Sequence, residues 1–211
     1  DPLVMNLSKD GVLDRIGELK PKVIGINALT PTFSKSVDIA KAIRARFPDV
    51  IIMVGGTKPT LTPNDILTDH PYFDISIIGE GEATLVELLA HFKKYSFDRK
   101  QSMAATIDLG KILGIVYRDT EHPTGVYSGK RPFVDLDTLP LPARHLLPIQ
   151  KYIPLPIQSK RLPVVHMMVS RGCPFNCSFC CTPFTWGRDV RFRSPEKVVE
   201  EIKHVMEKYG A

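Results

Sequence analysis

Four cysteines lie within nine residues of the chain: Cys173, Cys177, Cys180 and Cys181. The first three have the spacing Cys-x3-Cys-x2-Cys, with Phe179 directly before the third. A loop this short can gather three thiolates on one small inorganic group. The side chain of Cys181 diverges from that of its neighbour, so we treat it as a spare thiol. Three thiolates on a four-iron cluster leave one iron open to a ligand or substrate, and the spacing therefore predicts an iron–sulfur site.

Other uses of the cysteines fit the sequence less well. A structural zinc site usually pairs two Cys-x2–4-Cys knuckles, and neither His166 nor His204 supplies a second half-site. A disulfide framework is disfavoured because a chain of 211 residues can build a core and all its cysteines share one loop. Ferredoxin-type electron transfer would use shorter gaps and a remote fourth cysteine. Zinc and inert thiols remain as alternatives.

The cysteine motif resembles the signature of the radical S-adenosylmethionine (SAM) enzymes. The flanking segments 170–172 and 191–196 are also similar to those of this family. The resemblance implies that Cys173, Cys177 and Cys180 bind a [4Fe–4S] cluster, whose open iron takes the amino and carboxylate groups of SAM. It further implies reductive cleavage of SAM to methionine and a 5'-deoxyadenosyl radical, which abstracts hydrogen from a substrate.

A strand and a helix are expected to position this loop. The apolar, β-branched run 164–169 predicts a buried strand. Ser194 is a candidate N-cap of a helix that Gly210 ends. The helix has apolar residues at helical spacing on one side and polar residues on the other. The apolar set is Val198, Val199, Ile202, Val205, Met206 and Tyr209, and the polar set is Glu200, Glu201, Lys203 and Lys208. The loop would then follow the carboxyl end of a strand, where barrel enzymes place their active sites.

The first part of the chain alternates between strand and helix patterns. This order predicts an α/β fold with a doubly wound, Rossmann-like parallel sheet. The strands are expected at 22–27, 50–54 and 73–78, and the helices at 37–47, 64–69 and 82–94. The last of these helices is expected to bury Leu85, Leu88, Leu89 and Phe92.

Three loops at the carboxyl ends of these strands could meet a ligand near a switch point in strand order. Each loop alone is more often an ordinary tight turn, and none has the Gly-x-Gly-x-x-Gly pattern of a nicotinamide site. Together with the cysteine motif, they resemble the cobalamin-binding domain that precedes the radical SAM barrel in one large subfamily. The resemblance implies cobalamin contacts at Thr30, Thr32, Gly55, Gly56, Thr57, Gly79, Glu80, Gly81 and Glu82.

The chain is expected to have three parts. Residues 1–95 would form the cobalamin-binding domain, with its first strand and helix missing. Residues 96–160 would form a linker with a small hairpin near 112–127 and a proline-rich crossing. Residues 161–211 would supply the first βα unit of a partial TIM barrel. Because the chain begins at Asp1 and a barrel needs ~200 residues or more, we expect a fragment, truncated at both ends, that does not turn over alone.

These patterns predict a cobalamin-dependent radical SAM enzyme for methyl transfer to carbon or a related radical reaction, including oxidative ring formation. A methylthiotransferase is one alternative, although its relatives carry three further cysteines and residues 1–172 contain none. A non-catalytic cobalamin- or redox-sensing module is the other. The expected partners are a small-molecule substrate and an electron donor such as flavodoxin or ferredoxin. A scattered net charge of +5 does not indicate nucleic-acid binding, no apolar run is long enough for a membrane span, and the cysteine usage suggests the cytoplasm.

Overall fold

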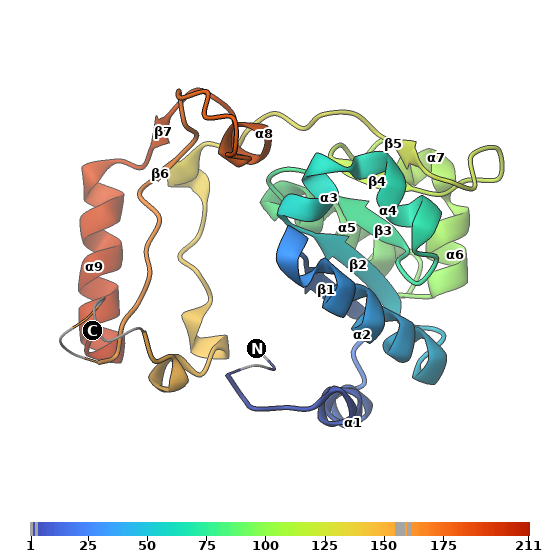
Figure 1. Cartoon of the computed structure of the whole chain (residues 1–211), viewed down its shortest axis with the longest axis horizontal. Coiled ribbons are helices and arrows are strands. Elements are labelled where there is room, and N and C mark those ends of the chain that lie inside the picture. Colours follow the sequence, from blue (N-terminus) through green and yellow to red (C-terminus); the bar gives the residue numbers. More distant parts are fainter. Residues whose placement is uncertain (1, 3, 155–158, 160–161) are drawn as a thin grey trace.

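A computed structural model describes residues 2, 4–154, 159 and 162–211 and contains a five-stranded sheet and a separate two-stranded ladder (Figure 1). The large sheet consists of β1 (Val23–Asn27), β2 (Ile51–Gly55), β3 (Ile75–Ile77), β4 (Ile115–Tyr117) and β5 (Val126–Tyr127). The ladder consists of β6 (Ser170–Arg171) and β7 (Arg191–Phe192). The α/β prediction is confirmed.

The large sheet is mostly parallel. Strands β1, β2 and β3 pair in parallel, whereas β4 and β5 are antiparallel to their neighbours. The described strands follow chain order, β1-β2-β3-β4-β5, so they contain no reversal that would form the expected switch point. β2 has both faces covered, because the side chains from Ile51 to Val54 are all buried. The carboxyl ends of the three parallel strands therefore meet at one edge of the sheet.

Helices cover both faces of this sheet and enclose two apolar clusters. One cluster packs Leu13, Ile43 and Phe73 against Ile52 and Val54. The other packs helices against Ile51 and Met53 on the opposite face. The helices of the first face are α1 (Lys9–Leu19), α2 (Phe33–Arg46) and α4 (Pro63–Asp69); α3 (Thr57–Leu61) follows β2. Those of the second face are α5 (Glu82–Lys94), α6 (Arg99–Ala104) and α7 (Thr106–Leu109).

The prediction for the buried face of α5 was half wrong. Leu88 and Phe92 are fully buried, but Leu85 and Leu89 are each 39% exposed. Leu88 and Phe92 lie four residues apart and face the sheet, whereas Leu85 is displaced around the helix toward an open cleft. An apolar residue at helical spacing can thus line a surface cleft instead of packing in the core.

The hairpin predicted near 112–127 forms, but it belongs to the sheet. β4 pairs with β3 through Ile75↔Tyr117, and β5 then pairs with β4. Two further parts of the predicted linker, 99–104 and 106–109, form α6 and α7 against the second face of the sheet. After β5, the described residues of the linker form only 3-10 turns, at Leu136–Thr138, Arg144–Leu146 and Ile149–Lys151. Residues 155–158 of the proline-rich crossing, and the predicted boundary at 160–161, lie outside the described residues.

Helix α1 precedes β1 and is absent from the sequence-based expectations. Its signals are ordinary ones: the Ser8 hydroxyl accepts a hydrogen bond from the Gly11 amide at 3.1 Å, and Leu13 turns into the core. Lys20 ends the helix in the left-handed conformation. Leu13 and Ile16 are three residues apart, so a search for a short amphipathic pattern could have found this helix.

The predicted strand at 164–169 was wrong. Only Ser170 and Arg171 form a strand, and Met168 and Val169 are about half exposed. A barrel strand is held by parallel neighbours, but β7 is the single partner of β6 in the described part of the chain and pairs with it antiparallel. The helix that follows is confirmed as α9 (Pro195–Tyr209), with Ser194 as its N-cap. None of the described helices is long and apolar enough to cross a membrane.

Candidate functional site

The cysteine loop runs from β6 to the short helix α8 (Thr182–Trp186), and β7 closes its base. Gly172 enters the loop with φ +98°, and a Cβ there would lie 2.1 Å from the Asp189 carbonyl oxygen, so only glycine fits. The Cys173 amide donates to the Gly187 carbonyl at 3.1 Å. Strand pairing and this bond hold the two ends of the loop together.

All four cysteines are free thiols. Cys177 is exposed, and a hydrogen bond with the Thr182 hydroxyl at 3.2 Å lowers the pKa of the Cys180 thiol. Across the described residues, no three His, Cys, Asp or Glu side chains gather closely enough to hold a metal ion, so the sulfur atoms would have to converge on a cluster. The donor set, three accessible unbridged thiols on one loop, suits a [4Fe–4S] group.

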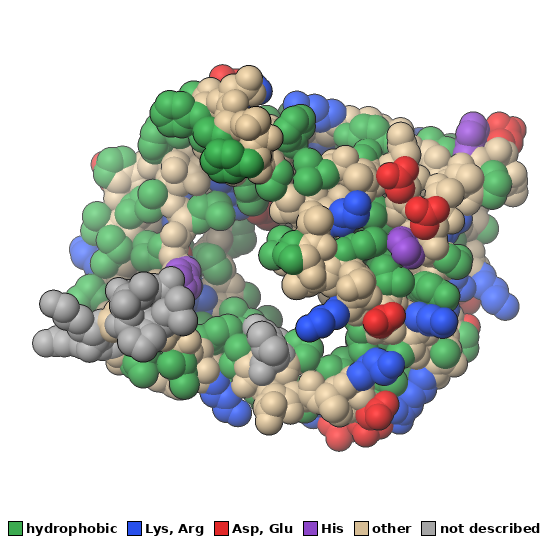
Figure 2. Space-filling model, viewed as in Figure 1, with side chains coloured by type: hydrophobic (Ala, Val, Ile, Leu, Met, Phe, Trp, Pro, Cys, Tyr) green, Lys and Arg blue, Asp and Glu red, His purple; other side chains and the backbone are tan. Residues whose placement is uncertain are grey.

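Large apolar side chains surround this loop. The exposed phenylalanines of the region are Phe175, Phe179, Phe184 and Phe192, and Phe179 is 91% exposed. Figure 2 shows hydrophobic side chains gathered over the part of the molecule that holds β7 and α8. Exposed apolar surface on this scale marks a site where something else packs.

A cleft of about 410 Å³ lies at the carboxyl ends of β1, β2 and β3. Five of the nine predicted cobalamin contacts line it: Gly55, Gly56, Gly79, Gly81 and Glu82. A glycine is required at position 56, because φ is +104° and a Cβ would lie 2.3 Å from Asn27 Oδ1. Five of the lining residues are glycines, beside apolar residues such as Ile26 and Leu85, and a bulky ligand can approach the backbone closely at the glycines.

The other four predicted contacts lie away from the cleft lining. Thr32 ends a 3-10 turn, where its hydroxyl accepts from the Leu29 amide at 3.3 Å, and Thr30 is exposed in the same turn. Thr57 begins α3. Glu80 is buried and turned toward the cysteine segment. Whether these residues touch cobalamin stays a prediction.

The cysteine loop and the cleft are neighbours. Helix α8, which follows Cys181, packs against α3, which follows β2 (Figure 1). Arg171, two residues before Cys173, donates to Glu82 Oε1 at 2.6 Å, and Glu82 lines the cleft. The second oxygen of that carboxylate, Oε2, is buried and has no hydrogen-bond partner in the described structure.

Glu80 also lies beside Arg171. The sequence predicted it as a cobalamin contact, whereas in the structure it contacts the cysteine segment. Its side chain is 2% exposed, and its carboxylate accepts hydrogen bonds from Arg191 and from the Val134 amide. Arg171 Nη1 lies 3.4 Å from Glu80 Oε1. Burial alone would raise the pKa of Glu80, but these hydrogen bonds outweigh it, and the pKa is lowered. Glu80 is therefore held as a carboxylate between the two parts of the molecule.

A second buried carboxylate, Glu201, was predicted on the polar side of its helix. It is 1% exposed and forms ion pairs with Arg144 and Arg193. Its position three residues after Val198 and four before Val205 places it on the apolar stripe, which could have signalled burial. Of the predicted apolar set, Val205 is buried, whereas Val199, Ile202 and Met206 are 41–58% exposed.

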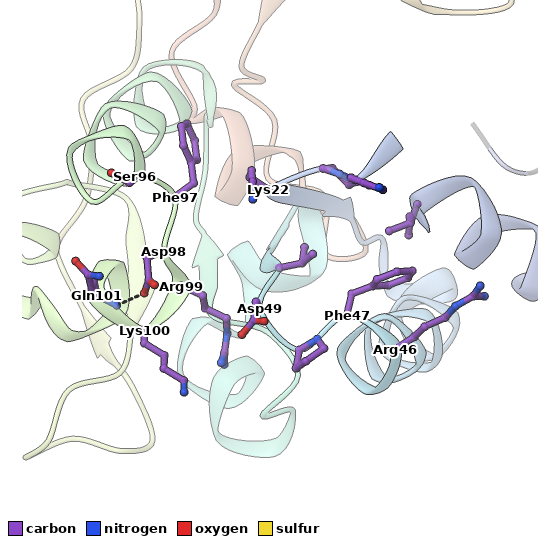
Figure 3. Close-up of a pocket in the computed structure, with 15 residues that line it drawn as sticks. Lys22, Arg46, Phe47, Asp49, Ser96, Phe97, Asp98, Arg99, Lys100 and Gln101 are labelled. Carbon is purple, nitrogen blue, oxygen red and sulfur yellow. Dashed lines mark hydrogen bonds between the residues drawn. The ribbon is translucent and has the colours of Figure 1, made fainter. Parts of the chain in front are cut away.

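Another cavity, of about 760 Å³, lies at the opposite edge of the sheet (Figure 3). It is lined near the amino ends of β1 and β2 by Lys22, Phe47 and Asp49, and near α6 by Phe97 and Lys100. Cations and carboxylates mix on its wall, and none of the cysteines lines it. It is not part of the cysteine site.

Comparison with known families agrees with this geometry. Residues 3–89 match the B12 binding domain, and residues 167–211 match the radical SAM superfamily. The chain joins a B12-binding domain to a radical SAM segment. Strands β1 to β3 and the cleft lie within the first match, and the cysteine loop lies within the second. These families imply cobalamin, SAM and a [4Fe–4S] cluster as cofactors.

The relatives of this pair of segments include cyclases and methyltransferases. The chain is 32% identical, over 99% of its length, to the anaerobic magnesium-protoporphyrin IX monomethyl ester cyclase of Rubrivivax gelatinosus. It is 29% identical over 98% to the hopanoid C-3 methylase of Methylococcus capsulatus, and 28% over 89% to the cobalamin-dependent radical SAM methyltransferase TokK of Streptomyces tokunonensis. It covers 35%, 37% and 26% of these relatives, respectively, so it spans about a third of their length.

Proposed function

We propose that this chain is the cofactor-bearing part of a cobalamin-dependent radical SAM enzyme that transfers a methyl group to carbon or carries out a related radical reaction. The observation that carries the proposal is the adjacency of the two sites. The glycine-rich cleft lies beside the cysteine loop, through the Glu82–Arg171 contact and the packing of α8 on α3.

Each residue set has a separate task in this proposal. Cys173, Cys177 and Cys180 would hold the cluster, and Cys181 stays a free thiol. The backbone at Gly55, Gly56, Gly79 and Gly81 would meet one face of the corrin. When bound, the cluster would supply the electron that cleaves SAM, and cobalamin would supply the methyl group.

The apolar side chains around the loop would exclude water from a cofactor or substrate that packs against them. The four exposed phenylalanines near the loop are apolar and carry no group that exchanges protons with the site. Glu82 keeps one buried carboxylate oxygen without a partner at the rim of the cleft. It can accept a hydrogen bond from an amide N–H, a group that the corrin periphery carries.

A small-molecule substrate and a one-electron donor such as flavodoxin or ferredoxin complete the proposal, and the cytoplasm is the proposed compartment. The alternatives are weaker. A methylthiotransferase would need further cysteines that residues 1–172 lack. The relatives described above are a cyclase and two methyltransferases, which favours turnover over sensing.

Anaerobic reconstitution tests the proposal. The chain, and the longer protein that contains it, should bind hydroxocobalamin and about four irons with three cysteines as ligands. The longer protein, given SAM and a reductant, should release 5'-deoxyadenosine. Failure to bind cobalamin would refute the assignment of the cleft as a cobalamin site. A cluster-loaded longer protein that releases no 5'-deoxyadenosine would refute the radical SAM activity.

A further inference from the structure

The base of the cysteine loop has an unfavourable charge arrangement of its own. Arg171 of β6 and Arg191 of β7 are direct partners in the ladder. Like charges directly opposite each other destabilise a strand pair. The ladder has only two residues in each strand, so its pairing does little to offset this repulsion.

The compensating charge comes from the B12-binding domain. Glu80, which follows β3, is hydrogen-bonded to Arg191 and ion-paired with Arg171. Its neighbour Glu82 binds Arg171 at 2.6 Å. The two carboxylates therefore neutralise both arginines from across the domain boundary.

Aromatic rings fix the two arginines from the other side. The Arg171 guanidinium lies 4.7 Å from the ring centroid of Trp186, and that of Arg191 lies 4.3 Å from the ring of Phe133. Arg191 also donates to the Val134 carbonyl at 2.9 Å. A planar guanidinium that stacks on a ring and pairs with a carboxylate is held in one orientation. The ammonium group of a lysine would not be held in this way.

We propose that Glu80 is a positioning residue that docks the base of the cysteine loop onto the rim of the cleft and so sets the separation between cluster and cobalamin. This inference rests on the proposed function. It assigns Glu80 to the domain junction instead of to direct cobalamin contact. Arg171 and Arg191 are its two receiving groups.

The first test needs no cofactor. Hydrogen exchange of the purified chain is measured for segments 170–173 and 187–193, which contain the ladder and the Cys173 amide. Loss of a buried charge partner in Glu80→Gln should speed exchange there about tenfold or more. The control is Glu87→Gln in α5, the helix that begins two residues after Glu80; its ion pair with Arg131 does not reach the loop. Unchanged exchange in Glu80→Gln would overturn the inference.

The second test measures position. In the chain loaded with reduced cluster and cob(II)alamin, pulsed dipolar EPR should give one narrow distance, which Glu80→Gln should lose and Glu87→Gln keep. The double variant Glu80→Gln/Arg191→Gln relieves the like-charge repulsion, so exchange should slow again while the distance stays broad. A narrow distance in that double variant would show that Glu80 only stabilises the ladder, and would overturn the inference. A wild-type chain without bound cobalamin would instead refute the proposed function, and the exchange experiment would still decide the role of Glu80.

Discussion

Substitution of Glu201 by glutamine should destabilise the radical SAM segment more than any surface change nearby. Glu201 is 1% exposed and lies between Arg144, 5% exposed, and Arg193, 11% exposed. Removing the charge leaves two nearly buried guanidinium groups without their counter-ion. Breaking a buried ion pair by removing one partner costs about 3–5 kcal/mol. Glutamine keeps one acceptor oxygen, so we expect the lower end, about 3 kcal/mol.

Urea unfolding followed by the fluorescence of Trp186 measures this change. It is the single tryptophan of the chain and lies in α8, so its signal reports on the radical SAM segment. The control is Glu200→Gln on the same helix, whose carboxylate is 57% exposed and pairs with Lys197. This exposed pair is worth about 0–1 kcal/mol. A loss in Glu201→Gln of less than about 1 kcal/mol, equal to the control, would refute the argument from burial.

The same variant has a pH signature. Burial would raise the pKa of Glu201, but hydrogen bonds from Arg193 and Arg144 outweigh it and lower the pKa. A carboxylate with a lowered folded pKa contributes stability above its unfolded pKa of about 4.3, and this contribution is lost as the pH falls through the folded value. The difference between wild type and Glu201→Gln should therefore be full at neutral pH and shrink below that unfolded value. A difference that grows on acidification would contradict the assigned charge state.

Four further substitutions separate the two cofactor sites. Cys177→Ser should lose cluster iron after anaerobic reconstitution, whereas Cys181→Ser should keep it, as measured by iron content and EPR. Gly56→Ala should weaken hydroxocobalamin binding by at least about tenfold in an absorbance titration, because its Cβ would lie 2.3 Å from Asn27 Oδ1 at a φ of +104°. Gly172→Ala should also lower iron retention, since its Cβ would meet a backbone carbonyl oxygen at 2.1 Å. Equal iron in the two cysteine variants, or unchanged cobalamin affinity in Gly56→Ala, would refute the respective assignment.

The parts of the fold that the sequence predicted are those with a local cause. Short apolar-rich runs predicted β1 to β3, of which only 50–54 is continuously apolar, and the Ser194 cap with its following apolar spacing predicted α9. The strand at 164–169 failed because a strand depends on partners that local sequence does not contain. The antiparallel pairing of β4 with β3 likewise depends on tertiary contacts and not on local sequence.

The same division holds for the candidate site. The cysteine motif and the paired glycines are chemical features that sequence displays directly. Glu80 and Glu201 were assigned other roles, because a carboxylate gives no local sign of an arginine that lies far away in sequence. Glu80 meets Arg191 across 111 positions, and Glu201 meets Arg144 across 57. Contacts of this range can be assigned only once the two parts of the chain are folded against each other.

Glu80 and Glu201 are both buried carboxylates that pair with two arginines near the base of the cysteine loop. Glu80 joins the arginines of β6 and β7 to the B12-binding domain, and Glu201 joins Arg193, just after β7, to α9 and to Arg144 of the proline-rich crossing. Buried ion pairs add little net stability compared with apolar packing, but their partners and geometry are specific. The phenylalanines around the loop are exposed and do not hold it in place. Besides the packing of α8 against α3, the position of the loop depends on charge pairing at its base, which leaves its apolar surface free to meet cofactor and substrate.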